Sequence, residues 1–129
     1  MAEKAVVRTE RAPAPFQGAP YSQAIATGGF VFVSGQLALE PGGNEIVGDT
    51  IGEQTEQVMT NLAAILEEAG SALDRLVKTT VFLANLADFH GMNEVYARHV
   101  GEQPPARSTI EVAALPSGAL VEIDAIAAI

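Results

Sequence analysis

The sequence contains no cysteine and no tryptophan, and only 7 of its 129 residues are lysine or arginine. The absence of cysteine excludes disulfides, thiolate metal ligands and a cysteine nucleophile. No apolar run is long enough to span a bilayer, and the first residues lack the apolar segment of a secretory signal. We therefore expect a cytoplasmic protein with no membrane partner.

The few basic residues are outnumbered by 16 acidic ones, which gives a formal net charge of -9. Lysine and arginine do not cluster anywhere, and an acidic surface repels a phosphate backbone, so no nucleic-acid partner is expected. Hydrophobic residues nevertheless make up 48% of the chain. In a small domain part of this apolar surface is exposed on the monomer, and such patches usually mark interfaces, so we expect an oligomer.

The length fits a single domain over residues 1–129. Gly28-Gly29 separates two apolar segments, 22–27 and 30–36, and predicts a two-residue hairpin turn. Strict alternation in the second segment puts side chains on two faces. One face holds Phe30, Phe32 and Ser34, and the other holds Val31, Val33 and Gly35.

Two helices are predicted from apolar residues at helical spacing. Thr50 and Glu53 have the spacing of a capping box and open a helix that Gly70 ends. A second helix runs from about Asp88 to Gly101. The prolines before Tyr21 exclude a helix from the opening stretch.

The remaining apolar segments are predicted strands at 5–9, 76–83, 106–112 and 120–129. The fold class is therefore α+β, with about six strands in a mixed sheet and two helices packed on one face. The last strand is apolar on both of its faces. Because two helices cover only one side of a sheet, we expect neighbouring subunits to close over the other side.

Several catalytic classes lack their signatures. The sequence has no P-loop, no GxGxxG, no HExxH, and no GxSxG around Ser34 or Ser108. His90 and His99 are nine residues apart with no obvious partner, and we interpret them as solvent-facing helix residues rather than ligands. No metal site is predicted.

Arg107 follows two prolines and begins a predicted strand, so its guanidinium is held on stiff backbone. Such a group is suited to bidentate binding of a carboxylate. The alternative is an arginine in a surface or subunit ion pair, and the residues alone leave both open.

Glu122 and Asp124 alternate with apolar residues and share one strand face. Desolvation of a carboxylate on such a strand raises its pKa, which suits general acid-base chemistry, whereas a solvated face would leave both acids inert. Tyr21 follows Pro20 and could close a pocket with its phenol, or it could be an ordinary packed residue.

Eight segments in order resemble the Rid family, also called YjgF or L-PSP. They span nearly the whole chain and include Ala19-Pro-Tyr-Ser-Gln23, Val33-Ser-Gly-Gln36, Val77-Lys-Thr-Thr-Val-Phe-Leu83, Pro105-Ala-Arg-Ser108 and Val121-Glu-Ile-Asp-Ala-Ile-Ala127. The resemblance implies a chorismate-mutase-like fold and a homotrimer with pockets between subunits. It also implies hydrolysis of reactive enamines and imines, such as 2-aminoacrylate and 2-iminobutanoate, to 2-keto acids and ammonia, without a cofactor.

The resemblance also implies roles for individual residues. Arg107 would bind the substrate carboxylate and Glu122 would activate water. The remaining substrate contacts would come from Tyr21, Ser34, Gly35, Asn93 and Thr109. Thr109 stands where many members have cysteine, and Ala19 where many have glycine, so substrate preference is open.

Three other functions are compatible with the same resemblance. The trimer could bind a 2-keto acid or similar anion without turnover. It could act as a ribonuclease or translation inhibitor, which the acidic charge disfavours. It could also be a specialised pathway enzyme on the same fold, such as a chorismate mutase or an aromatic-catabolism deaminase.

Overall fold

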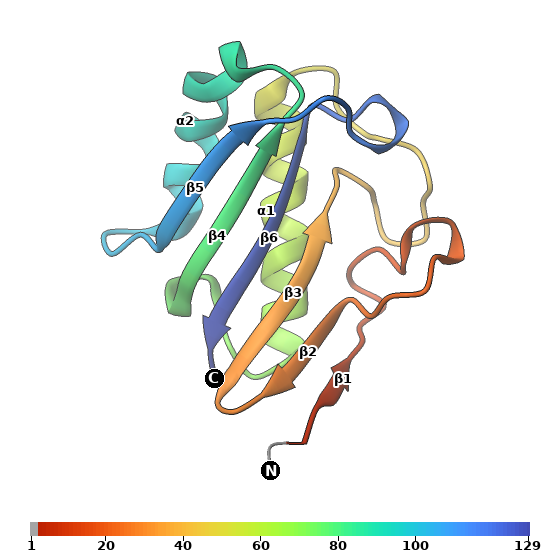
Figure 1. Ribbon diagram of the computed structural model, residues 1–129, viewed down its shortest axis with the longest axis vertical. Coiled ribbons are helices and arrows are strands. Elements are labelled where there is room, and N and C mark those ends of the chain that lie inside the picture. Colours follow the sequence, from red (N-terminus) through yellow and green to blue (C-terminus); the bar gives the residue numbers. More distant parts are fainter. Residues whose placement is uncertain (1–2) are drawn as a thin grey trace.

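The computed structural model describes residues 3–129, and its six strands form one mixed sheet (Figure 1). The order across the sheet is β1-β2-β3-β6-β4-β5, where only the β4–β5 pair is parallel. The strands are β1 (Ala5–Val7), β2 (Ala24–Thr27), β3 (Phe30–Gln36), β4 (Leu76–Leu83), β5 (Ala106–Glu111) and β6 (Val121–Ala128). The helices α1 (Ile51–Glu68) and α2 (Phe89–Val100) lie on one face of this sheet (Figure 1), which confirms the predicted α+β class.

The hairpin and the first helix form for the local reasons that the sequence indicated. Thr27 pairs with Phe30 across Gly28 and Gly29, whose φ angles of 60° and 84° are those of a type I′ turn. The Thr50 hydroxyl accepts a hydrogen bond from the Glu53 N–H at 3.1 Å, and the Glu53 carboxylate accepts one from the Thr50 N–H at 3.1 Å. The predicted capping box is therefore present.

The opening stretch differs from its prediction in one detail. Residues 16–18 form a single 3-10 turn, in which Gln17 has a φ of 53°. The nearby prolines prevent an α-helix but not one isolated turn, because such a turn does not need the N–H groups that proline lacks. This turn brings Phe16 toward the end of β3.

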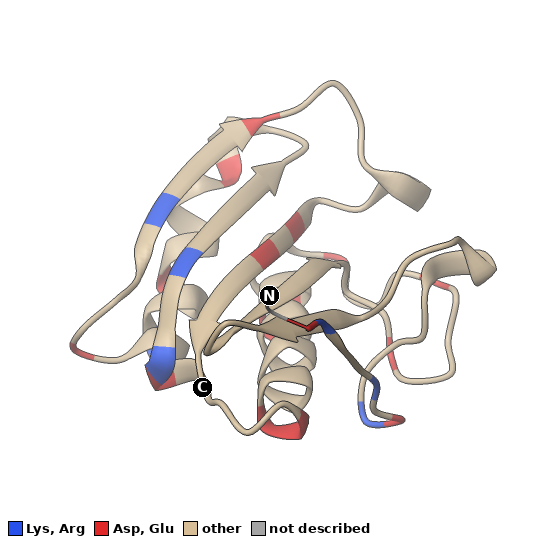
Figure 2. Ribbon diagram, turned by 60° about the horizontal axis from the view of Figure 1, so that its bottom comes forward, with Lys and Arg blue, Asp and Glu red and all other residues tan. Residues whose placement is uncertain are grey.

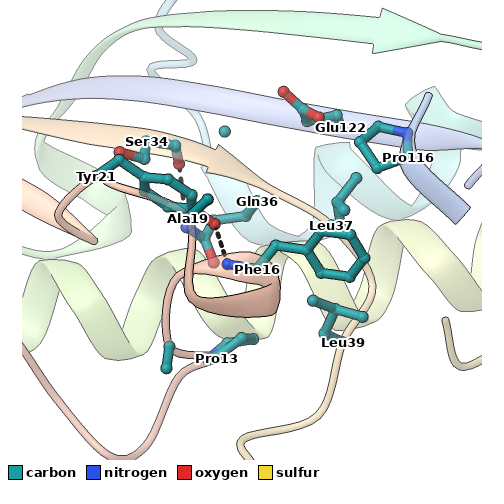
Figure 3. Close-up of a pocket in the computed structure, with 12 residues that line it drawn as sticks. Pro13, Phe16, Ala19, Tyr21, Ser34, Gln36, Leu37, Leu39, Pro116 and Glu122 are labelled. Atoms are coloured by element: carbon teal, nitrogen blue, oxygen red, sulfur yellow. Dashed lines mark hydrogen bonds between the residues drawn. The ribbon is translucent and has the colours of Figure 1, made fainter. Parts of the chain in front are cut away.

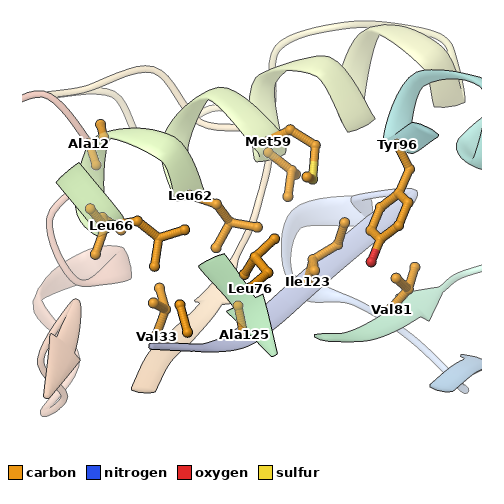
Figure 4. Packing of buried hydrophobic residues seen from close by; sticks show 14 of the residues in the cluster. Ala12, Val33, Met59, Leu62, Leu66, Leu76, Val81, Tyr96, Ile123 and Ala125 are labelled. Carbon is orange, nitrogen blue, oxygen red and sulfur yellow. The ribbon is translucent and has the colours of Figure 1, made fainter. Parts of the chain in front are cut away.

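The hydrophobic core fills the space between the helices and the sheet (Figure 4). Met59, Leu62 and Leu66 of α1 are fully buried above Ile123 and its neighbours on β6. Asn61 is also fully buried, and its amide donates to the main-chain oxygens of Leu37 at 3.1 Å and Leu39 at 2.9 Å. The same helix that builds the core therefore anchors the chain that follows β3.

No helix of residues 3–129 lies over the opposite face of the sheet (Figure 1). Phe30 and Phe32 of β3 are 41% and 43% exposed there, and Ile110 of β5 is 46% exposed. Alternate residues of β6 are buried and half-buried, so this strand is enclosed on one face only. The prediction of a sheet that is apolar on both faces is confirmed. Within residues 3–129, no helix is long and apolar enough to cross a membrane.

A β-bulge in β3 determines on which face of the sheet Gly35 lies. Val33 pairs with Ala125 but Gln36 pairs with Ile123, so two residues of β3 lie opposite one residue of β6. Strict alternation predicted that Gly35 shares the face of Val33, and that prediction is wrong. The extra residue turns Gly35 onto the open face, where it contacts Glu122.

Candidate functional site

A cavity of about 330 Å³ opens beside the end of β3 and the start of β6 (Figure 3). We call it the carboxylate cavity, because Glu122 is the acidic residue among those that line it. The other lining residues are Pro13, Ala14, Phe16, Ala19, Tyr21, Ser34, Gly35, Gln36, Leu37, Leu39 and Pro116. Four of the residues predicted for the site, Tyr21, Ser34, Gly35 and Glu122, are therefore brought together here.

Glu122 lies half-buried on the open face of β6. Burial raises the pKa of its carboxyl group above the ordinary value, and the negative charge of Asp124 raises it further. Gly35 makes room for this side chain, because a Cβ at residue 35 would lie only 2.8 Å from the Glu122 carboxyl carbon. A desolvated carboxylate beside bare backbone can approach a bound ligand and exchange protons with it.

Tyr21 and Ser34 provide the polar side of the cavity. The Tyr21 phenol oxygen accepts a hydrogen bond from the Phe16 N–H at 2.5 Å, which leaves its own O–H free to donate. The Ser34 hydroxyl donates to the Ser22 main-chain oxygen at 2.6 Å, which leaves its lone pairs free to accept. The cavity thus offers one donor and one acceptor at fixed positions.

Gln23 holds the wall of the cavity in place, and the sequence did not single it out. Its buried amide nitrogen donates to the main-chain oxygens of Thr9, Ala12 and Pro13 at 3.0, 3.3 and 2.8 Å. Its amide oxygen accepts from the Thr9 N–H at 2.7 Å. One side chain therefore replaces the strand partners that residues 9–13 lack. Its place at the end of the motif Ala19-Pro-Tyr-Ser-Gln23 was the signal that could have pointed to it.

Arg107 lies in a second depression, between β5 and α2, which we call the arginine cleft. Its guanidinium carbon is 4.9 Å from the ring centroid of Tyr96 and 5.6 Å from that of Phe89. The ion pairs within residues 3–129 are Arg11–Glu67 and His99–Glu56, so Arg107 has no carboxylate partner in the described chain. The guanidinium is held by aromatic rings and remains available to an anion.

Asn93 and Thr109 lie on the same side of the sheet as Arg107. Asn93 lines the arginine cleft with Tyr96. Thr109 pairs with Val81 and Arg107 pairs with Thr79, so both side chains share the face that α2 covers. The side-chain oxygens of Asn93 and Thr109 are buried without a hydrogen-bond partner within the described residues. Buried polar atoms are normally paired, so both oxygens have unused hydrogen-bonding capacity on the side of the sheet that α2 covers.

The two groups of predicted site residues lie apart in one chain. Arg107 faces the helices, whereas Glu122 faces the open side of the sheet, and β4 separates their strands (Figure 2). Thr79 pairs with Arg107 on one side and with Ala125 on the other, so Ala125 is level with Arg107. Glu122 lies three residues along β6 from Ala125. That offset is about 10 Å along the strands and about 10 Å across them. A single chain cannot bring both groups to one small ligand.

The two histidines do not take part in either depression. His90 is exposed, and His99 is half-buried with its Nε2 at 2.9 Å from a Glu56 carboxylate oxygen. The sequence had indicated no partner for His99, because residues 43 apart cannot be related before the helices are packed. Among residues 3–129, no group of three His, Asp or Glu side chains is placed to hold a metal ion.

Some residues of the two depressions were not predicted for a site. Phe16, Leu37 and Pro116 line the carboxylate cavity, and Tyr96 lies against Arg107. Tyr96 had no predicted role in the site. Its hydroxyl is 2.6 Å from the Thr79 hydroxyl, so the ring that contacts Arg107 is fixed by a buried hydrogen bond. Burial raises the pKa of this phenol, which stays neutral.

Comparison with known proteins identifies the family. The family described as Endoribonuclease L-PSP matches residues 9–129. A RutC family protein of Pyrococcus abyssi is 52% identical over 124 residues, which cover 96% of each chain. The chloroplastic Reactive Intermediate Deaminase A of Arabidopsis thaliana is 48% identical over 125 residues, which cover 97% of this chain and 66% of that protein. The structure of TdcF from E. coli with bound serine superimposes with a TM-score of 0.88 at 36% identity, covering 97% of this chain and 98% of that chain. The chain belongs to the Endoribonuclease L-PSP family, which is the Rid (YjgF) family that its motifs resemble.

Proposed function

We propose that this chain, as a single domain of residues 1–129, is an imine deaminase that works as a homotrimer. It hydrolyses small imines and enamines derived from amino acids, such as 2-iminobutanoate and 2-aminoacrylate, to 2-keto acids and ammonia. Each active site forms where the arginine cleft of one subunit meets the carboxylate cavity of the next. The family's inclusion of a reactive intermediate deaminase supports the reaction class.

The observation that carries this proposal is the division of charge between the two depressions. Among residues 3–129, the arginine cleft has a guanidinium without a carboxylate partner, and the carboxylate cavity has Glu122 and no lysine or arginine in its lining. An amino-acid imine needs both, because it carries a carboxylate and an electrophilic carbon. The exposed apolar side chains Phe30, Phe32 and Ile110 on the open face support subunit packing there.

In the proposed mechanism the protein mainly orients the substrate and the attacking water, because the protonated imine carbon is already electrophilic. Arg107 binds the substrate carboxylate through two parallel hydrogen bonds. An enamine first takes a proton at its terminal carbon and becomes the protonated imine. Water then adds to the imine carbon while the Glu122 carboxylate accepts a water proton. That proton passes to the nitrogen, and the carbon–nitrogen bond then breaks and releases ammonia while the carbinol hydroxyl gives its proton to the Glu122 carboxylate and becomes the keto group. The ammonia takes this proton and leaves as ammonium, so Glu122 returns to its carboxylate form.

The activity is tested by competition with semicarbazide. An amino-acid oxidase generates the imine, and semicarbazide traps whatever is not hydrolysed. Wild-type protein is expected to lower semicarbazone formation, whereas Arg107→Ala and Glu122→Gln are not. Arg75→Ala is the matched control, because Arg75 is exposed and lies outside both depressions. Equal behaviour of wild type and Arg107→Ala across several imines would contradict the proposal.

The shared site is tested by mixing inactive subunits. Arg107→Ala and Glu122→Gln trimers are unfolded together and refolded as mixtures. In a cyclic trimer each mixed assembly regains one intact site of three, so equal mixing restores about a quarter of the wild-type activity. A site built within one chain regains none. Light scattering on the wild type measures whether the assembly is a trimer.

Two other functions are outcomes of the same experiments. If Glu122→Gln and wild type bind 2-keto acids equally and neither hydrolyses an imine, the trimer is an anion-binding protein. The family description names an endoribonuclease, so RNA cleavage is measured as well. Three of the seven basic residues lie in the stretch 4–11, the other four are spread over residues 75–107 (Figure 2), and the net charge is -9. We therefore expect no salt-dependent RNA binding.

A further inference from the structure

A cavity that the proposed reaction does not use lies beside the carboxylate cavity. Its volume is about 630 Å³, and we call it the N-terminal cavity because most of its lining residues belong to the stretch 6–15. Ala14 and Tyr21 line both cavities, so the loop between these two residues forms part of the wall of each. We propose that the N-terminal cavity binds a free α-amino acid in its zwitterionic form, with an apolar side chain such as that of leucine.

Two opposite charges of the lining are available to such a ligand. Arg8 and Glu10 both line the cavity, and both are exposed. The ion pairs within residues 3–129 involve other side chains, so Arg8 and Glu10 pair neither with each other nor with a third group there. A ligand that carries both charges can contact both residues. Its carboxylate accepts hydrogen bonds from the Arg8 guanidinium, and its ammonium group donates to the Glu10 carboxylate.

The same two residues disfavour ligands of a single charge. Among residues 3–129, the lining contains one arginine, one glutamate and no further charged side chain, so its formal charge is zero. The neighbouring bases Lys4 and Arg11 do not line the cavity. A phosphate or a dicarboxylate is repelled by Glu10, and a polyamine is repelled by Arg8. The charge pattern therefore fits a dipolar ligand without net charge.

An apolar side chain on the ligand has a matching surface to cover. Val6 lines the cavity and is 60% exposed, which is the largest exposed fraction among the large apolar side chains of residues 3–129. Pro15 and Pro41 belong to the same lining. Removal of this apolar surface from water favours binding, and glycine has no side chain with which to cover it. The cavity volume lies within the range of about 300–1,000 Å³ that is usual for small-ligand sites.

One wall of the cavity is held by the fold itself. Val7, Thr9, Ala12 and Gln23 all line the cavity and are all buried. The Gln23 amide oxygen accepts a hydrogen bond from the Thr9 N–H at 2.7 Å, and the Gln23 amide nitrogen donates to the Thr9 main-chain oxygen at 3.0 Å. Because this wall is ordered without a ligand, binding does not have to order it.

Binding is measured by titration calorimetry on the assembled Arg107→Ala protein. That variant lacks the guanidinium proposed for substrate carboxylates, so the heat of binding reports on the N-terminal cavity. The probes are L-leucine, 4-methylpentanoate, which lacks the ammonium group, 3-methylbutylamine, which lacks the carboxylate, and glycine, which lacks the side chain. We expect L-leucine to bind at least about tenfold more tightly than each of the other three.

Two variants of the charged residues and one control test the contacts. Arg8→Gln and Glu10→Gln, each made in the Arg107→Ala protein, are expected to weaken L-leucine binding at least about tenfold. Arg8→Gln should not weaken 3-methylbutylamine binding, and Glu10→Gln should not weaken 4-methylpentanoate binding. Arg11→Gln is the matched control, because Arg11 lies in the same stretch but outside the lining and pairs with Glu67. It is expected to keep the affinity for L-leucine, and circular dichroism and light scattering verify folding and assembly of all variants.

Each contrary result overturns the proposal. Absence of L-leucine binding to the Arg107→Ala protein means that the cavity is not an amino-acid site. Equal affinities for L-leucine and 4-methylpentanoate, or an affinity that Glu10→Gln does not change, mean that only an anion is recognised. An equal loss in Arg8→Gln and Arg11→Gln means that the effect is one of general charge. None of these measurements depends on imine hydrolysis, so the semicarbazide experiment and this one succeed or fail independently.

Discussion

The aromatic ring of Tyr96 lies against the guanidinium of Arg107, with the Arg107 Cζ atom 4.9 Å from the ring centroid. The ring belongs to α2 and the arginine to the edge strand β5, so the contact joins the two elements that form the arginine cleft. The Tyr96 hydroxyl is in turn held by Thr79 at 2.6 Å. Tyr96 is therefore a positioning residue for Arg107.

Two replacements of Tyr96 are expected to have different main effects, one on substrate binding and the other on the free energy of unfolding. Tyr96→Leu removes the aromatic face, and we expect KM to rise about 2-fold to 30-fold with a smaller change in kcat, because a cation–π contact contributes about 0.5–2 kcal/mol and each 1.4 kcal/mol is tenfold. Tyr96→Phe keeps the face but leaves the buried Thr79 hydroxyl unpaired, which costs about 1–3 kcal/mol of unfolding free energy. The double variant Tyr96→Phe/Thr79→Val regains part of that loss. An unchanged KM in Tyr96→Leu would mean that β5 alone positions Arg107.

Gly35 is expected to tolerate no side chain in the active enzyme. Its φ is not positive, so alanine fits the backbone, but the new Cβ would lie 2.8 Å from the Glu122 carboxyl carbon. Gly35→Ala therefore displaces Glu122 by a fraction of an ångström or more, and we expect kcat/KM to fall at least about tenfold. Gly52→Ala is the control, since its Cβ meets Val95 at an ordinary 3.6 Å. Equal activity of the two variants would show that Glu122 position is not critical.

Removal of the Asp124 charge is expected to move the pH dependence of the reaction. Burial is the main cause of the raised Glu122 pKa, and the Asp124 charge adds to it. Asp124→Asn therefore lowers the Glu122 pKa, so the carboxylate that accepts the water proton is present at lower pH. The acid limb of the kcat/KM profile should shift toward acid in this variant and stay in place in Asp74→Asn, where the acid is exposed in the 3-10 turn before β4. A shift toward alkali would contradict the assignment of Glu122 as base.

Gln23 is expected to be a major determinant of stability near the site. Gln23→Leu keeps the size of the side chain but leaves the Thr9 N–H and three main-chain oxygens without their partner. Because orphaned buried groups cost about 1–3 kcal/mol each, with partial relief by water, we expect a loss of about 2–4 kcal/mol. Urea unfolding measures this loss, with the exposed Gln103→Leu as the control. A loss below about 0.5 kcal/mol would mean that residues 9–13 are held by other contacts.

Local sequence determined the elements whose causes lie within a few residues. Gly28-Gly29 alone provides the positive φ angles of the hairpin, and Thr50 with Glu53 satisfies the first N–H groups of α1 whatever surrounds them. The alternation of Val121, Glu122, Ile123 and Asp124 also sufficed to put both acids on one face. The resemblance to the family indicated which residues belong to the candidate site, and the roles of these residues in catalysis and substrate binding remain predictions.

Only the tertiary structure decided where those residues lie relative to one another. The bulge that turns Gly35 toward Glu122 depends on the register of β3 against β6. These strands have 84 residues between them in the chain, because β3 ends at Gln36 and β6 begins at Val121. The separation of Arg107 from Glu122 depends on β4 lying between β5 and β6, and on which face each strand presents to the helices. Spacing along the chain carries no information about either, because strand order and register are set by long-range pairing and by burial of the core.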